Sequence, residues 1–75
     1  MKEKILAVLS GLHPEFDYSQ SENFIDEGLI DSFDVVSLIG MLNEEFSIEI
    51  SGEDVVPENF CNIDTLVNLV NKYIG

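Results

Sequence analysis

The chain has 75 residues, which allows one small domain and leaves no room for a separate cofactor domain. Three lysines and no arginine oppose fifteen acidic residues, so the formal net charge is −12. Nucleic-acid backbones and anionic membranes are therefore excluded as partners, because no basic patch exists to bind their phosphates. Since 45% of the residues are hydrophobic, the chain is also too apolar for an acidic disordered tail. We expect a single folded acidic domain over 1–75 whose partners present basic faces.

Cysteine and histidine each occur once, as Cys61 and His13. One cysteine cannot form an internal disulfide, and these two residues cannot supply the usual zinc ligand set. The N-terminal segment carries Glu3 where a signal peptide would be basic, and no small-residue cleavage site follows it. The longest apolar stretch is far short of a membrane span. We expect a complete cytoplasmic chain without a metal site.

The first predicted element is an amphipathic helix over 2–12, ended by Pro14. Its apolar residues recur at helical spacing, namely Ile5, Val8, Leu9 and Leu12. Residues 14–31 then lack any sustained period but include several large apolar side chains. We expect a long ordered loop whose Phe24 and Leu29 enter the core. Loops of this length are uncommon in small domains and are often functional.

A second helix is predicted from Asp31-Ser32 to about Phe46. Its apolar stripe consists of Val35, Leu38, Ile39, Leu42 and Phe46. Asp31 is a favourable N-cap residue, and Asp34 in the first turn suits the positive end of the helix dipole.

The remaining residues predict a connector, one short turn and a closing helix. The alternating residues 47–50 have no second strand to pair with, so we expect an extended connector that buries Ile48 and Ile50. One short helical turn is expected over 53–56, stopped by Pro57. The last helix is predicted over 63–74 after an Asn62 N-cap, with a buried face of Ile63, Leu66, Val67, Val70 and Ile74. The predicted architecture is all-α, a small four-helix bundle of three longer helices and one short helix.

Few residues indicate a catalytic or metal-binding role on their own. His13 is interpreted as a helix-end residue favourable to the dipole, and Cys61 as a packing or turn residue, because neither has a partner group that catalysis requires. No calcium-loop pattern occurs among the acids. Ser32 differs, since a phosphate on its hydroxyl would meet the positive end of the second helix. On spacing alone, however, Asp31-Ser32 is explained as an ordinary helix start.

The residues around Ser32 favour a functional interpretation of this serine. The segment GLIDSFD at 28–34, followed by Val36, Leu38, Leu42 and the sequence EEF at 44–46, resembles the acyl carrier proteins. The resemblance covers nearly the whole chain. It implies a four-helix bundle with 4′-phosphopantetheine joined by a phosphodiester to Ser32. A phosphopantetheinyl transferase would attach it from coenzyme A with Mg²⁺ and would recognise Asp31.

The resemblance also implies a docking surface on the second helix. Phe33 and Val36 would be its apolar anchors, and Asp34 with Glu44 its steering charges. The sequence departs from fatty-acid carriers in having Phe33 after the serine, no acid at Ser37 and Asn43, and a longer segment over 55–64. The longer segment over 55–64 resembles the one in stand-alone carriers that serve amino-acid-activating ligases, including D-alanyl carrier proteins.

We therefore expect a monomeric carrier of activated acyl or aminoacyl groups rather than an enzyme. Its partners would be the transferase, an acyl- or aminoacyl-activating ligase and downstream acyl-transfer enzymes with basic faces. Two alternatives stay open from the residues. One is an unmodified acidic helical module for protein interaction. The other is a small hydrolase using Ser32, which would need a base and an oxyanion hole.

Overall fold

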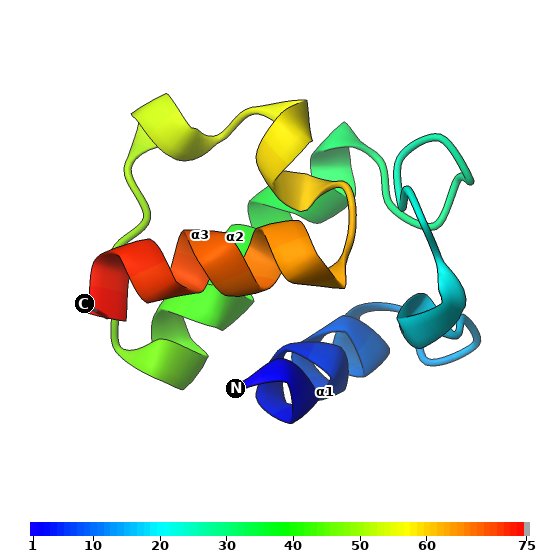
Figure 1. Cartoon of the computed structure of the whole chain (residues 1–75), viewed down its shortest axis with the longest axis horizontal. Helices are drawn as coiled ribbons and strands as arrows, with labels where there is room; N and C mark the ends of the chain where they lie inside the picture. The colour runs from blue at the N-terminus through cyan, green and yellow to red at the C-terminus, as the bar shows by residue number, and fades with distance from the viewer. Residues whose placement is uncertain (75) are drawn as a thin grey trace.

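The computed structural model describes residues 1–74, and among these residues every regular element is helical. The three α-helices are α1 (Lys2–Leu12), α2 (Ser32–Phe46) and α3 (Ile63–Ile74) (Figure 1). Three 3₁₀ turns connect them, namely η1 (Tyr18–Gln20), η2 (Gly52–Asp54) and η3 (Pro57–Phe60). The all-α prediction is confirmed, and the expected bounds of the three longer helices agree with the structure. The fourth, short helix is not confirmed, because two separate 3₁₀ turns occupy its place.

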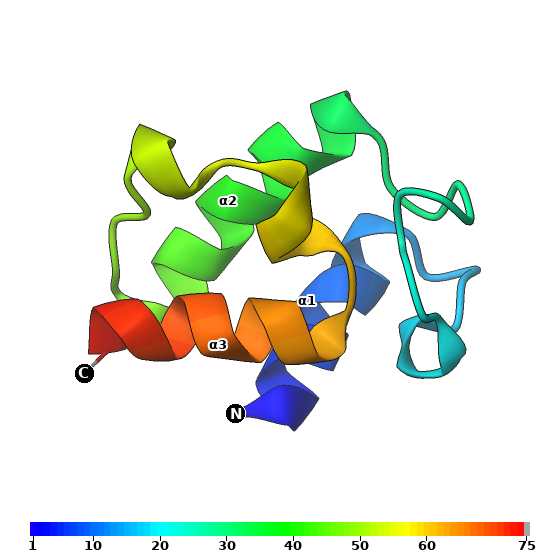
Figure 2. The ribbon, with the colours of Figure 1, turned by 45° about the horizontal axis from the view of Figure 1, so that its top comes forward.

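The helices pack so that α1 contacts both α2 and α3, while η3 packs against α3. Figures 1 and 2 show α3 crossing α2, with the long loop of residues 13–31 at the end of the molecule away from the last turn of α3. None of the helices in residues 1–74 has the length and apolar character needed to cross a membrane.

The core is apolar throughout the described residues, with no buried polar or charged side chain. Its fully buried members are Ile5, Leu9, Phe24, Leu38, Leu42, Phe60, Leu66 and Val70. Phe24 enters the core as predicted, whereas Leu29 only packs against it and Ile30 is buried instead. Ile50 is buried in the connector as expected, and Ile48 is partly buried.

The loop is held by its backbone as well as by Phe24. The Phe24 N–H donates to the Cys61 carbonyl at 2.5 Å, which ties the loop to the segment before α3. The Leu29 N–H donates to the Phe24 carbonyl at 2.8 Å, in a turn where Gly28 has φ +77°. A left-handed backbone of this kind favours glycine, because a Cβ would crowd the following carbonyl.

The turn expected over 53–56 begins one residue earlier and ends two residues earlier, at Asp54, so Pro57 does not stop it. The Ser51 hydroxyl accepts the Glu53 N–H at 3.3 Å, so η2 begins at Gly52. Pro57 instead begins η3, since a proline needs no N–H partner in the first turn of a helix and its φ is already suitable. Sequence reasoning used proline only as a helix stop and therefore missed the second turn.

The closing helix begins as predicted, but a different residue of its last turn faces the core. The Asn62 side chain accepts the Thr65 N–H at 2.9 Å, and the Thr65 hydroxyl accepts the Asn62 N–H at 3.1 Å. The prediction that Ile74 is buried is wrong, because its side chain is 50% exposed. Tyr73 packs inward in its place, and Leu69, which the predicted stripe omitted, is buried.

Tyr73 takes the inner position because its hydroxyl has partners there. It accepts the Ser51 N–H at 2.8 Å and donates to the carboxylate of Asp54. Lys72 donates to the same carboxylate at 2.8 Å. The hydrogen bonds from Lys72 and then Tyr73 lower the pKa of Asp54, which stays ionised and fastens η2 to α3.

Candidate functional site

Ser32 is the first residue of α2, and its side chain is exposed. The residue before it, Asp31, has extended backbone and accepts the Asp34 N–H with its Oδ1 at 2.9 Å. In return, Asp34 Oδ2 accepts the Asp31 N–H at 3.2 Å. This reciprocal capping box satisfies backbone donors that a helix start leaves without partners. The predicted Asp31 N-cap is confirmed, and it fixes the backbone that presents the Ser32 hydroxyl.

An apolar hollow of about 260 Å³ adjoins this hydroxyl. We call it the Ser32 hollow; its lining residues are Ile25, Ser32, Val35, Val36, Val55, Val56, Pro57 and Phe60. It lies between the first half of α2 and the segment that leads into η3, and Figure 2 shows the backbones of these two segments passing each other. Sequence reasoning did not assign residues 55–57 to a site, although two adjacent valines before a proline in an otherwise acidic segment were a signal.

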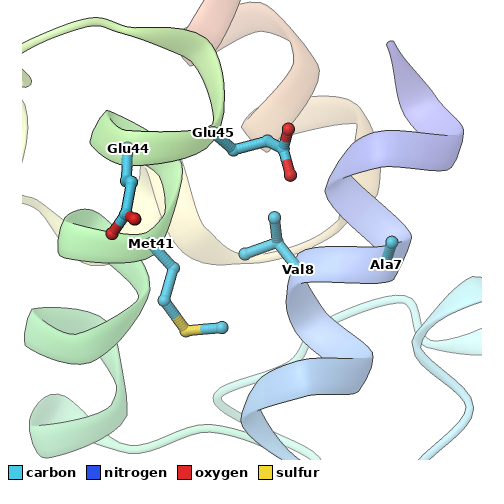
Figure 3. A pocket seen from close by; sticks show the side chains of 5 residues that line it. All are labelled: Ala7, Val8, Met41, Glu44 and Glu45. Atoms are coloured by element: carbon cyan, nitrogen blue, oxygen red, sulfur yellow. The ribbon is translucent and has the colours of Figure 1, made fainter.

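A second hollow lies between α1 and α2 and is lined by Ala7, Val8, Met41, Glu44 and Glu45 (Figure 3). It is the larger of the two, at about 480 Å³. In Figure 3, Glu45 extends from α2 towards α1, whereas Glu44 stays on the α2 side. Glu44 is twelve residues after Ser32 in the same helix, which separates them by about 18 Å along the axis. Of these two hollows, the Ser32 hollow is therefore the one close enough to contact a group attached to Ser32.

The exposed side of α2 carries two large apolar side chains next to Ser32. Phe33 is 81% exposed and Val36 is 69% exposed. Residues three apart in a helix are neighbours on its surface, so the two form one apolar patch. Glu44, two turns further along, is also exposed, and no ion pair involves it within residues 1–74.

Asp34 is held differently from Glu44. Its side chain is 19% exposed, and Oδ2 lies 3.0 Å from Nε2 of His13. Partial burial opposes its ionisation, but the hydrogen bonds from His13 and from the Asp31 N–H outweigh burial and lower the pKa of Asp34. Its carboxylate is thus already engaged within the chain, and its part in steering a partner stays a prediction.

His13 and Cys61 occupy the local positions that the sequence indicated. His13 is the C-cap of α1, although its contact with Asp34 was not foreseen. Cys61 is half-buried in the turn before α3, and its Sγ donates to the Pro57 carbonyl at 3.1 Å. No group of three or more metal-ligating side chains gathers within residues 1–74.

Comparison with known proteins identifies the family. Residues 3–71 match a family model described as a phosphopantetheine attachment site. The chain is also 32% identical over 72 residues to an acyl carrier protein of Buchnera aphidicola subsp. Baizongia pistaciae (strain Bp), which covers 96% of this chain and 88% of that protein. The chain belongs to the acyl carrier protein family. The search of solved structures found none that matches it.

The cofactor of this acyl carrier protein family member is 4′-phosphopantetheine. The described residues fit such a group. Ser32 offers an exposed hydroxyl at a helix N-terminus, where the backbone dipole favours a phosphate. The adjoining hollow offers apolar surface to an arm or cargo that leaves the phosphate.

Proposed function

We propose that the chain carries activated acyl or aminoacyl groups, with the 4′-phosphopantetheine attached to the Ser32 hydroxyl, and that it is not itself an enzyme. The proposal rests on one observation, the exposed hydroxyl that begins α2 and also lines an apolar hollow. Family membership supports it, since the matched model is that of an attachment site. When attached, the group supplies a thiol that holds cargo as a thioester.

The residues around Ser32 have distinct parts in this proposal. The capping box of Asp31 and Asp34 keeps the first turn of α2 in one conformation, so that a transferase meets the hydroxyl in a fixed position. Asp31 is also the residue by which the transferase would recognise this turn. The valines of the Ser32 hollow shield apolar cargo from water, which favours their contact by the hydrophobic effect.

We assign partner docking to the exposed side of α2. Phe33 and Val36 form its apolar anchor, and Glu44 supplies a charge with no partner in the described chain. A net charge of −12 would steer the carrier towards basic enzyme faces and raise association rates by about 10- to 10³-fold. The partners we propose are the transferase, an activating ligase and downstream acyl-transfer enzymes.

A specialised acyl or aminoacyl role is favoured over general fatty-acid synthesis. Asn43 stands where fatty-acid carriers have an acid, and its side chain has a structural task here. Its Oδ1 accepts the Ile50 N–H at 3.0 Å, while its carbonyl accepts the N–H groups of Ser47 and Ile48. Because this residue is a neutral amide, this part of α2 lacks one charge of the acidic docking face.

The experiment is to offer the pantetheine-bearing protein to purified acyl- and aminoacyl-activating ligases with a panel of fatty acids, short acids and amino acids. Intact-protein mass would report the cargo. We expect one amino acid or short acid to be loaded, and none on a Ser32→Ala variant. Loading of long-chain fatty acids alone would contradict the specialised role. A chain that no transferase modifies would instead be the unmodified interaction module.

A further inference from the structure

His13 connects the end of α1 to the beginning of α2. Its Nε2 lies 3.0 Å from Asp34 Oδ2, the same oxygen that accepts the Asp31 N–H. Its Nδ1 lies 3.9 Å from a carboxylate oxygen of Glu15, and the ring meets Phe16 edge-on with centroids 5.6 Å apart. A single carboxylate oxygen therefore joins the histidine to the N-cap residue that precedes Ser32.

Two carboxylates face this histidine, Asp34 from α2 and Glu15 from the loop. Both also act on the phenol of Tyr18 in η1. Burial, and then the negative charges of Asp34 and Glu15, raise the pKa of Tyr18 to about 12, so the phenol stays neutral near physiological pH. The pKa of Asp34 is lowered, so it stays charged there. Histidine is the residue type in this cluster whose charge ordinarily changes between about pH 5 and 8.

We propose that His13 is a pH-sensitive clasp: when protonated, it holds the end of α1 to the first turn of α2, and the loss of its proton loosens the turn that presents Ser32. A protonated imidazole donates from Nε2–H to a carboxylate with the added attraction of opposite charges. A neutral imidazole can still donate, but that attraction is gone. The clasp is therefore closed on the acidic side of the histidine titration and weakened as the pH rises through it.

Deprotonation of His13 would affect the turn at Ser32 because Asp34 Oδ2 contacts both the His13 ring and the Asp31 N–H. Loss of the cation leaves Asp34 freer to move, and with it the carboxylate that accepts the N-cap N–H. The distance from His13 to Asp34 in sequence means that only the folded loop brings them together. The inference concerns the folded chain alone and does not depend on what Ser32 carries.

The test is an NMR pH titration of the unmodified full chain from about pH 5 to about pH 8. We expect the backbone amides of residues 32–35 to follow the same titration curve as the His13 ring. The amides of Asp31, Asp34 and Val35 donate hydrogen bonds at this turn, and their protection from hydrogen exchange, corrected for intrinsic pH effects, should fall about two- to fivefold above the midpoint, the size expected for an ion pair near the surface. Amides that stay constant while the His13 ring titrates would overturn the proposal.

Two variants locate the effect. His13→Gln keeps an N–H donor without a titrating charge, so the amides of residues 32–35 should lose their response over this range. Glu15→Gln removes the more distant acid and should leave the response intact. The proposal fails if the His13→Gln protein keeps the wild-type response, or if Glu15→Gln abolishes it. Should His13→Gln fail to fold, the wild-type titration decides alone.

Discussion

The carboxylate of Asp31 accepts the backbone N–H of Asp34, and the carboxylate of Asp34 accepts the backbone N–H of Asp31. This exchange marks the first turn of α2 as a defined structure rather than a frayed end. Ser32, the residue that we propose is modified, lies between these two acids in the sequence. The stability of this turn and the modification of Ser32 can therefore be tested by separate substitutions.

Two substitutions at Asp31 distinguish the effect of its N-cap hydrogen bond from the effect of its negative charge. Asp31→Ala should lower the free energy of unfolding by about 1 kcal/mol, since it removes the N-cap acceptor. Asp31→Asn should stay near wild type in stability, because asparagine caps equally well, yet slow modification of Ser32 if the transferase recognises the charge. Urea denaturation and modification rates measure the two effects. Asp26→Ala, which removes an exposed loop carboxylate, is the control for net charge; an equal loss of stability there would refute the capping explanation.

Among residues 1–74, two have a positive φ, and substitutions at them should change stability in opposite directions. Gly28→Ala should destabilise the fold by about 1 kcal/mol, because alanine is strained at φ +77° although its Cβ would meet no atom within 4 Å. Ser47 has φ 54° at the C-cap of α2, so Ser47→Gly should relieve strain and stabilise by about 0.5 kcal/mol. Urea midpoints would show the sign of each change. Two shifts in the same direction would contradict the backbone explanation.

Tyr18 should govern part of the alkaline unfolding. Its folded pKa of about 12 exceeds the ordinary value of 10.0, chiefly because it is buried. The folded state thus holds the proton more tightly than the unfolded state. The stability that this contributes is complete below about pH 10 and is lost as the pH rises towards 12. Tyr18→Phe should flatten the loss of stability over that window in alkaline denaturation. An unchanged slope would show that Tyr18 does not titrate with unfolding.

The helix starts could be predicted from sequence because their signals are local. Asp31 and Asn62 are capping residues three positions before their hydrogen-bond partners, and both caps are present in the structure. The contact of His13 with Asp34 could not be predicted, since a loop without periodicity determines where the two meet. The Ser32 hollow was missed for a similar reason, because it needs η3 to fold back beside α2.

Partner docking should divide into a charge effect and a contact effect. Glu44→Lys should slow association with the loading enzyme, most clearly at low salt, because an exposed steering charge acts on the association rate. Phe33→Ala should weaken the docked complex without changing its salt dependence. Association and dissociation rates over a salt series would distinguish them. Glu3→Lys on α1 is the matched charge control, and an equal effect there would mean that net charge alone, not this face, is responsible.

The most direct test of the account is the site of modification. The chain should be incubated with coenzyme A, Mg²⁺ and a broad-specificity phosphopantetheinyl transferase, and its intact mass measured. The account predicts the addition of one phosphopantetheinyl group to the wild-type protein and to Ser37→Ala, which lacks another exposed serine of α2. It predicts no addition to Ser32→Ala. Modification of the Ser32→Ala protein would contradict the assignment of Ser32 as the attachment residue.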